Sequence, residues 1–131
     1  MDDASLRADE EEFHSAYRVF LDAVRMLASS VAEQCESMGD FKVAWELKDD
    51  VKGGRYLVGR GYLNAEQEAW LSALAGALDA VPAQVLPSRG GRELNMAAMS
   101  HPSWIPLRVI ASHVLEALSP FTSENSKYLG L

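Results

Sequence analysis

Apolar residues recur at steps of three and four along residues 13–38, which is the spacing of one face of an α-helix. Gly39 follows this stripe, and glycine often ends a helix because it adopts the left-handed cap conformation at little cost. The pattern predicts one long helix over residues 13–38, with the middle of the stripe, from Phe20 to Val31, buried. The members of the stripe are Phe13, Tyr17, Phe20, Val24, Leu27, Val31, Cys35 and Met38.

Residues 41–63 fit two patterns. Apolar residues alternate with polar ones from Phe41 to Leu47, which is the period of a β-strand and would allow a hairpin at about residues 41–60. The composition of the same stretch favours a helix, and Asp49-Asp50 fits no two-residue hairpin turn. We therefore predict a helix over about residues 41–52, and then an irregular or extended passage through Gly59 and Gly61, where glycine allows a positive φ angle in a turn.

The next part of the chain contains a longer and a shorter helical pattern. Asn64 is followed three residues later by Gln67, which resembles a capping box at the start of a helix. Apolar residues then keep the helical period until Pro82, which ends the run. The pattern of residues 92–99 predicts a short helix, which His101-Pro102 interrupts. We expect the imidazole of His101 to form a hydrogen bond with nearby backbone.

The last pattern predicts a helix with Ser103 as its N-terminal cap and Pro106 in its first turn. We expect it to end at Pro120, with residues 121–131 docked on the domain because they are too apolar for a free tail. These elements predict an all-α bundle of about four to five helices forming a single domain over residues 1–131. The alternative is an α+β domain with the one hairpin.

Composition narrows the classes of function. Hydrophobic residues make up 48% and charged residues 24% of the 131 residues, as in an ordinary globular domain. The one cysteine, Cys35, allows no intrachain disulfide, which favours a reducing compartment and a cytoplasmic location. The start of the sequence lacks a signal-peptide pattern, and no apolar run is long enough to span a membrane.

The negative charge is concentrated at the N-terminal end. The formal net charge is −7, and residues 1–40 alone carry ten acids against three bases. Such a field disfavours nucleic acid and attracts a cationic protein partner. It predicts a partner-binding surface that is formed by carboxylates. The candidates are Glu10, Glu11, Glu12, Asp49 and Asp50.

No pattern of catalytic or metal-binding residues appears. Glu11 and His14 form a single Glu-x-x-His, whereas di-iron bundles need two copies and two further glutamates, so we interpret them as a solvated helix start. The other histidines and Cys35 are too scattered for a zinc site, and Cys35 is expected to be buried in the core. Trp45, Trp70 and Trp104 are candidates for an aromatic cage or an interface anchor, but we favour their interpretation as core residues, because Trp70 and Trp104 lie on helical stripes. We predict no cofactor, no metal and no enzymatic activity.

One stretch of the sequence resembles small helical bacterial proteins of the immunity and antitoxin type. It contains Asn95, Met96, Met99, His101-Pro102, Trp104 and Pro106-Leu107. The resemblance implies an inhibitory protein that binds a basic toxin domain. One alternative is a helical oligomerisation or adaptor module, in which a second apolar face of the first helix (Val19, Ala23 and Met26) is buried in a homodimer. Another is a small enzyme whose site the sequence does not reveal.

Overall fold

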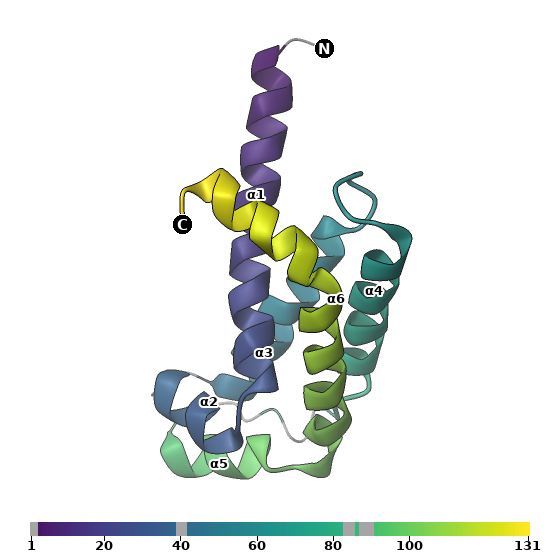
Figure 1. The fold of residues 1–131 in the computed structure, drawn as a ribbon. Coiled ribbons are helices and arrows are strands. Elements are labelled where there is room, and N and C mark those ends of the chain that lie inside the picture. The colour runs from purple at the N-terminus through teal and green to yellow at the C-terminus, as the bar shows by residue number, and fades with distance from the viewer. Residues whose placement is uncertain (1–2, 39–41, 83–85, 87–90) are drawn as a thin grey trace.

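The computed structural model describes residues 3–38, 42–82, 86 and 91–131, and in these residues it shows six α-helices and no strand (Figure 1). The prediction of an all-α bundle is confirmed. The alternative hairpin is wrong, because residues 43–57 are helical. The irregular or extended passage predicted after residue 52 is wrong for residues 53–57, which form a 3₁₀ helix. The helical elements are α1 (Asp3–Ala28), α2 (Val31–Met38), α3 (Val43–Lys52), the 3₁₀ helix η1 (Gly53–Leu57), α4 (Ala65–Asp79), α5 (Arg92–Met99), the 3₁₀ helix η3 (Pro102–Trp104) and α6 (Ile105–Leu129).

α1 and α6 form the frame of the bundle. α6 packs against both α1 and α4, whereas α2 and α5 pack together at one end. Figure 1 shows the N-terminal turns of α1, in purple, extending beyond the other helices. None of the helices in the described part of the chain is long and apolar enough to cross a membrane.

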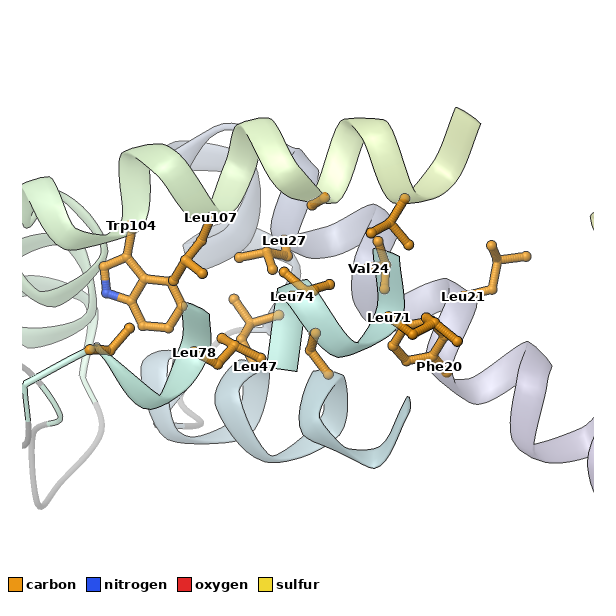
Figure 2. Packing of buried hydrophobic residues seen from close by; sticks show 14 of the residues in the cluster. Phe20, Leu21, Val24, Leu27, Leu47, Leu71, Leu74, Leu78, Trp104 and Leu107 are labelled. Carbon is orange, nitrogen blue, oxygen red and sulfur yellow. The ribbon is translucent and has the colours of Figure 1, made fainter. Parts of the chain in front are cut away.

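The core lies where the inner faces of the helices meet (Figure 2). Trp104 and Leu27 are completely shielded from solvent, and Cys35 is also buried, as predicted. Trp70 packs against the edge of the core, but Trp45 is 44% exposed, so its interpretation as a core residue is wrong. The other buried residues labelled in Figure 2 are Phe20, Leu21, Val24, Leu47, Leu71, Leu74, Leu78 and Leu107.

The predicted single helix over residues 13–38 is wrong, because the chain leaves the helix at Ser29 and Ser30 before α2 begins. Serine hydroxyls compete for backbone hydrogen bonds, which favours helix ends. The Ser29 hydroxyl donates to the Met26 carbonyl at 2.6 Å, and the Ser30 hydroxyl accepts from the Glu33 amide at 3.2 Å. After this break Val31 is only partly buried, contrary to the prediction.

The capping box at the start of α4 is confirmed. The Gln67 amide donates to the Asn64 side chain at 2.8 Å, and the Asn64 amide donates to the Gln67 side chain at 2.9 Å. Ser103, in contrast, does not cap α6, because it lies within η3. The ring of His101 accepts a hydrogen bond from the Ser103 amide at 3.1 Å, so the prediction that His101 bonds nearby backbone is confirmed.

The predicted end of the last helix at Pro120 is also wrong, since α6 continues to Leu129 with this proline inside it. A proline inside a helix removes one hydrogen bond and bends the chain. Figure 1 shows α6 changing direction between its green and yellow parts, so that the yellow part crosses α1. Packing on α1 stabilises this second part, in which Phe121 and Asn125 are buried; residues 121–131 therefore dock as predicted, but as helix.

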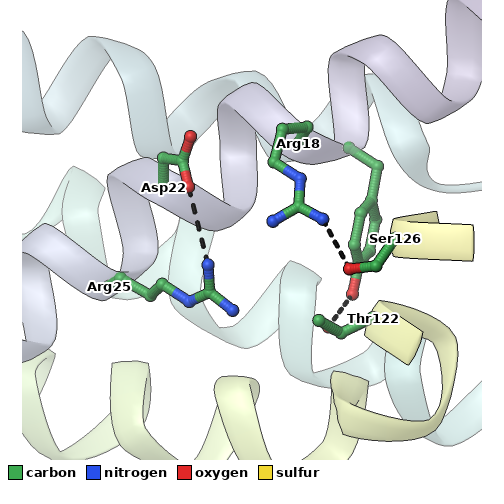
Figure 3. Close-up of polar contacts among 6 residues, drawn as sticks. Arg18, Asp22, Arg25, Thr122 and Ser126 are labelled. Atoms are coloured by element: carbon green, nitrogen blue, oxygen red, sulfur yellow. Dashed lines mark hydrogen bonds and ion pairs between the residues drawn. The ribbon is translucent and has the colours of Figure 1, made fainter. Parts of the chain in front are cut away.

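Polar contacts between α1 and α6 hold the second part of α6 in place (Figure 3). The Tyr17 hydroxyl lies 2.7 Å from the Thr122 hydroxyl and donates to the Leu118 carbonyl at 3.3 Å. Arg18 donates to the Ser126 hydroxyl at 2.8 Å. These contacts come from successive turns of α6 on both sides of its bend, so they fix the angle at which α6 crosses α1.

Candidate functional site

A cleft of about 440 Å³ opens between the N-terminal half of α1 and residues 56–62, which comprise the end of η1 and the turn after it. α1 presents a carboxylate-bearing edge to it, and residues 56–62 present two tyrosines and an arginine. Acidic, basic and aromatic groups therefore meet in one depression. The lining residues are Leu6, Asp9, Glu12 and Phe13 from α1, and Tyr56, Gly59, Arg60 and Tyr62 from the facing segment.

The segment after η1 is shaped by two glycines. Gly59 and Gly61 have φ angles of 78° and 88°, as predicted, and in this left-handed region other residues are strained. The Gly59 amide donates to the carboxylate of Glu68 in α4. Tyr62 packs its ring against Phe13, with 4.3 Å between the ring centroids. The segment is thus attached to α4 on one side and to α1 on the other.

Opposite charges act on the same tyrosine in the cleft. The guanidinium carbon of Arg60 lies 4.0 Å from the centroid of the Tyr56 ring, and Arg60 Nε donates to the Tyr56 carbonyl at 2.9 Å. The carboxylate of Glu12 faces the Tyr56 hydroxyl and is the main cause of the raised pKa of Tyr56. Burial and the charge of Asp9 act in the same direction, and Arg60 opposes them.

The structure separates the five carboxylates that the sequence suggested as a partner surface. Glu12 lines the cleft. Glu10 and Glu11 lie near the end of α6, where burial and then these two charges raise the pKa of Tyr128. Asp49 and Asp50 are exposed on α3; the pKa of Asp50 is raised by burial and by the charges of Glu46 and Asp49.

His14 is not the solvated residue that the sequence predicted; it is only 5% exposed. Its ring stacks on Tyr128 at 4.0 Å and on Phe121 at 5.5 Å. The amide nitrogen of Asn125 lies 3.0 Å from His14 Nδ1 and donates to the His14 carbonyl at 3.0 Å. The correction has a physical reason: α6 continues beyond Pro120 and covers this turn of α1.

Sequence reasoning missed Asp9, Tyr56, Arg60 and Tyr62 as members of the site. The Gly-Arg-Gly triplet at residues 59–61 was the available signal, because it places a cation on a sharp bend next to two tyrosines. The cleft lining offers carboxylates, phenols and a guanidinium. Among the described residues, no histidine, serine or cysteine side chain lines it. Those residues also contain no group of three His, Cys, Asp or Glu side chains that could hold a metal ion.

Comparison with known proteins finds no match: no protein-family model, curated protein or solved structure is significantly similar to this chain. The geometry and charge of the cleft are therefore the observations from which a function can be argued.

The buried position of His14 predicts a dependence of stability on pH. Burial lowers the pKa of His14 below its ordinary 6.5, although Glu10 and Glu124 oppose this shift. The unfolded chain therefore binds the proton first as the pH falls, and stability that is present above pH 6.5 is lost below it. Each unit of lowering corresponds to about 1.4 kcal/mol.

Urea denaturation at pH 7 and pH 5 tests this expectation. The free energy of unfolding of the wild type should fall between the two pH values, and His14→Gln should reduce that fall. His113→Gln is the comparison variant, because it removes a histidine at an exposed position. If His14→Gln and His113→Gln retain the same pH dependence as the wild type, the role of His14 is contradicted.

Proposed function

We propose that this protein is a non-catalytic binding protein that engages a basic protein partner through the acidic end of α1, as an immunity or antitoxin-type inhibitor would. The observation that supports the proposal is the cleft, in which Asp9 and Glu12 stand beside the rings of Tyr56 and Tyr62. Carboxylates next to aromatic faces suit a cationic side chain, which gains hydrogen bonds from the first and cation–π contacts from the second.

The position of the acids adds to this support. Residues 3–12 carry five acids and one base, and Figure 1 shows this part of α1 extending beyond the bundle. Asp9, Glu11 and Glu12 are exposed. A negative field on a protruding helix end attracts a basic surface and speeds its association. The single cysteine allows no intrachain disulfide, which fits the reducing, cytoplasmic compartment that forms part of the proposal.

The structure gives less support to the two alternatives, a homodimer and an enzyme, than to the binding protein. For a homodimer through the second face of α1, Val19 is 64% exposed, but Ala23 and Met26 already pack against the core of the same chain. For an enzyme, the cleft supplies carboxylates, but its lining offers no serine, cysteine or histidine nucleophile. A neighbouring gene for a basic toxin domain would support the inhibitor, and inhibition of that domain by this protein would establish it.

Charge reversal at the end of α1 should slow association with a cationic probe. A fluorescent arginine hexapeptide should bind the wild type with a rate constant that falls as salt rises, because ions screen charges beyond about 8–10 Å. The triple variant Glu10→Lys, Glu11→Lys, Glu12→Lys should lower the association rate constant by about tenfold or more at low salt. Stopped-flow fluorescence measures both effects.

The control is a triple variant with the same net charge in which the acids are reversed elsewhere: Glu36→Lys, Glu93→Lys and Glu116→Lys. These residues are exposed on α2, α5 and α6, so the variant should associate faster than the α1 variant. Circular dichroism should show the same helix content in both. A rate constant that is independent of salt, or equal effects of the two triple variants, would count against the proposed surface.

A further inference from the structure

The cleft beside α1 already contains a guanidinium that belongs to the protein itself. Arg60 is exposed, yet its side chain folds back so that the guanidinium carbon lies 4.0 Å from the Tyr56 ring centroid. The hydrogen bond from its Nε to the Tyr56 carbonyl holds this position. The site therefore shows, by its own occupant, which kind of cation its aromatic face accepts.

Arg60 does not neutralise the carboxylates of the cleft. The ion pairs among the described residues involve Arg25, Lys52 and Arg55, and not Arg60. Asp9 and Glu12 both line the cleft. Glu12 acts on the Tyr56 hydroxyl mainly as a hydrogen-bond partner, and Asp9 acts on it through its negative charge. A second guanidinium would thus find two carboxylates that take part in none of these ion pairs among the described residues.

The attachment of Arg60 is weak enough to be exchanged. It consists of one backbone hydrogen bond and one cation–π contact, both at an exposed site, where such contacts are individually weak. The backbone on either side is anchored independently, by the Gly59 amide on Glu68 and by Tyr62 on Phe13. The side chain of Arg60 can therefore leave the Tyr56 ring without moving the walls of the cleft.

We infer that the cleft is a receptor for an arginine side chain of the partner, and that Arg60 is an intramolecular occupant which the partner's arginine displaces. Arginine suits the site better than lysine, because its planar guanidinium can stack on the Tyr56 ring while donating two parallel hydrogen bonds to a carboxylate. This inference rests on the proposed function. It adds that the partner is recognised through an arginine side chain, and that Arg60 weakens binding until that arginine displaces it.

The test compares Arg60→Ala with Arg55→Ala in the full-length chain. Arg55 lies in η1, is exposed and pairs with Asp79 at 2.9 Å, so its removal changes the net charge equally but does not empty the cleft. The probe is the labelled arginine hexapeptide, with a lysine hexapeptide for comparison, and fluorescence anisotropy at low salt gives the dissociation constants.

Arg60→Ala is expected to tighten binding of the arginine peptide about fivefold to tenfold, as follows when an internal competitor fills a site most of the time. Arg55→Ala should change it less than about twofold, because it affects only the distant field. The gain from Arg60→Ala should be smaller for the lysine peptide. Asp9→Asn with Glu12→Gln should weaken binding of the arginine peptide in both the wild type and the Arg60→Ala background.

The outcomes separate the inference from the proposed function. One outcome is that Asp9→Asn with Glu12→Gln weakens binding, whereas Arg60→Ala has the same effect as Arg55→Ala. This outcome would support the acidic binding surface and overturn the displacement of Arg60. A loss of affinity in Arg60→Ala overturns it too, because Arg60 would then contact the ligand. If the arginine peptide does not bind the wild type, both the proposed function and the inference fail.

Discussion

Replacement of Leu27 by alanine is expected to lower the free energy of unfolding by about 2–5 kcal/mol, the range for truncating a buried leucine. The Leu27 side chain is completely shielded from solvent and lies in the core between α1 and the facing helices (Figure 2). The end of α1 is held in place by hydrogen bonds from Gln34, so the structure cannot easily close around the cavity that alanine leaves. Urea denaturation followed by circular dichroism measures the loss.

Val19→Ala is the matched control on the same helix. Val19 is 64% exposed, so its truncation should change the free energy of unfolding by less than about 0.5 kcal/mol. A loss of less than about 1 kcal/mol in Leu27→Ala, or equal losses in the two variants, would show that the apolar stripe of α1 is not a core face.

The helices were predictable because their apolar spacing depends only on near neighbours in the sequence. The stripe from Phe13 to Leu27 and the capping box at Asn64 are of this kind, and both appear in the structure as predicted. The break at Ser29 and Ser30 was missed because the stripe is uninterrupted in the sequence: Val31 and Cys35 continue the spacing of three and four. Spacing reports which residues are apolar, but it does not report a change of helix axis.

The second part of α6 illustrates the opposite error. Pro120 is a strong local signal for a helix end, but contacts with α1 override it. Tyr17, Arg18 and His14 all contact residues of α6 beyond or next to this proline, across sequence separations of about one hundred residues. Local reasoning has no access to such contacts, and for the same reason it left His14 in solvent.

The candidate site was predictable in its charge but not in its shape. A count of acids finds Glu12 and its neighbours, because charge is a property of composition. The cleft requires α1 to lie beside residues 56–62, so Tyr56 and Arg60 join the site only through tertiary packing. That packing also divides the predicted surface, since it turns Glu10 and Glu11 toward Tyr128 and leaves Asp49 and Asp50 on α3.

Gln34 is a buried residue that links α2 both to the end of α1 and to α6. Its side chain is completely shielded from solvent, and its amide nitrogen donates to the carbonyls of Met26, Leu27 and Ser29 at 3.1, 2.9 and 3.2 Å. These carbonyls at the end of α1 lack the partners that a continuing helix would supply. The side-chain oxygen accepts from Arg108 in α6 at 3.1 Å, so one glutamine joins the break after α1 to the last helix.

Gln34→Ala is expected to lower the free energy of unfolding by about 2–4 kcal/mol, because it removes the hydrogen bond to the buried Leu27 carbonyl and one of the two acceptors of the Arg108 guanidinium. Glu36→Ala, at an exposed position in the same helix, should cost less than about 0.5 kcal/mol.

Arg108 also donates to the Met99 carbonyl at 2.6 Å, so Arg108→Ala should be destabilising by itself. The double variant with Gln34→Ala should lose less than the sum of the two single losses, by about 0.5 kcal/mol or more. If urea denaturation shows that the two losses of unfolding free energy are strictly additive, Gln34 and Arg108 do not act together. A loss below about 1 kcal/mol in Gln34→Ala would mean that Gln34 does not hold the end of α1.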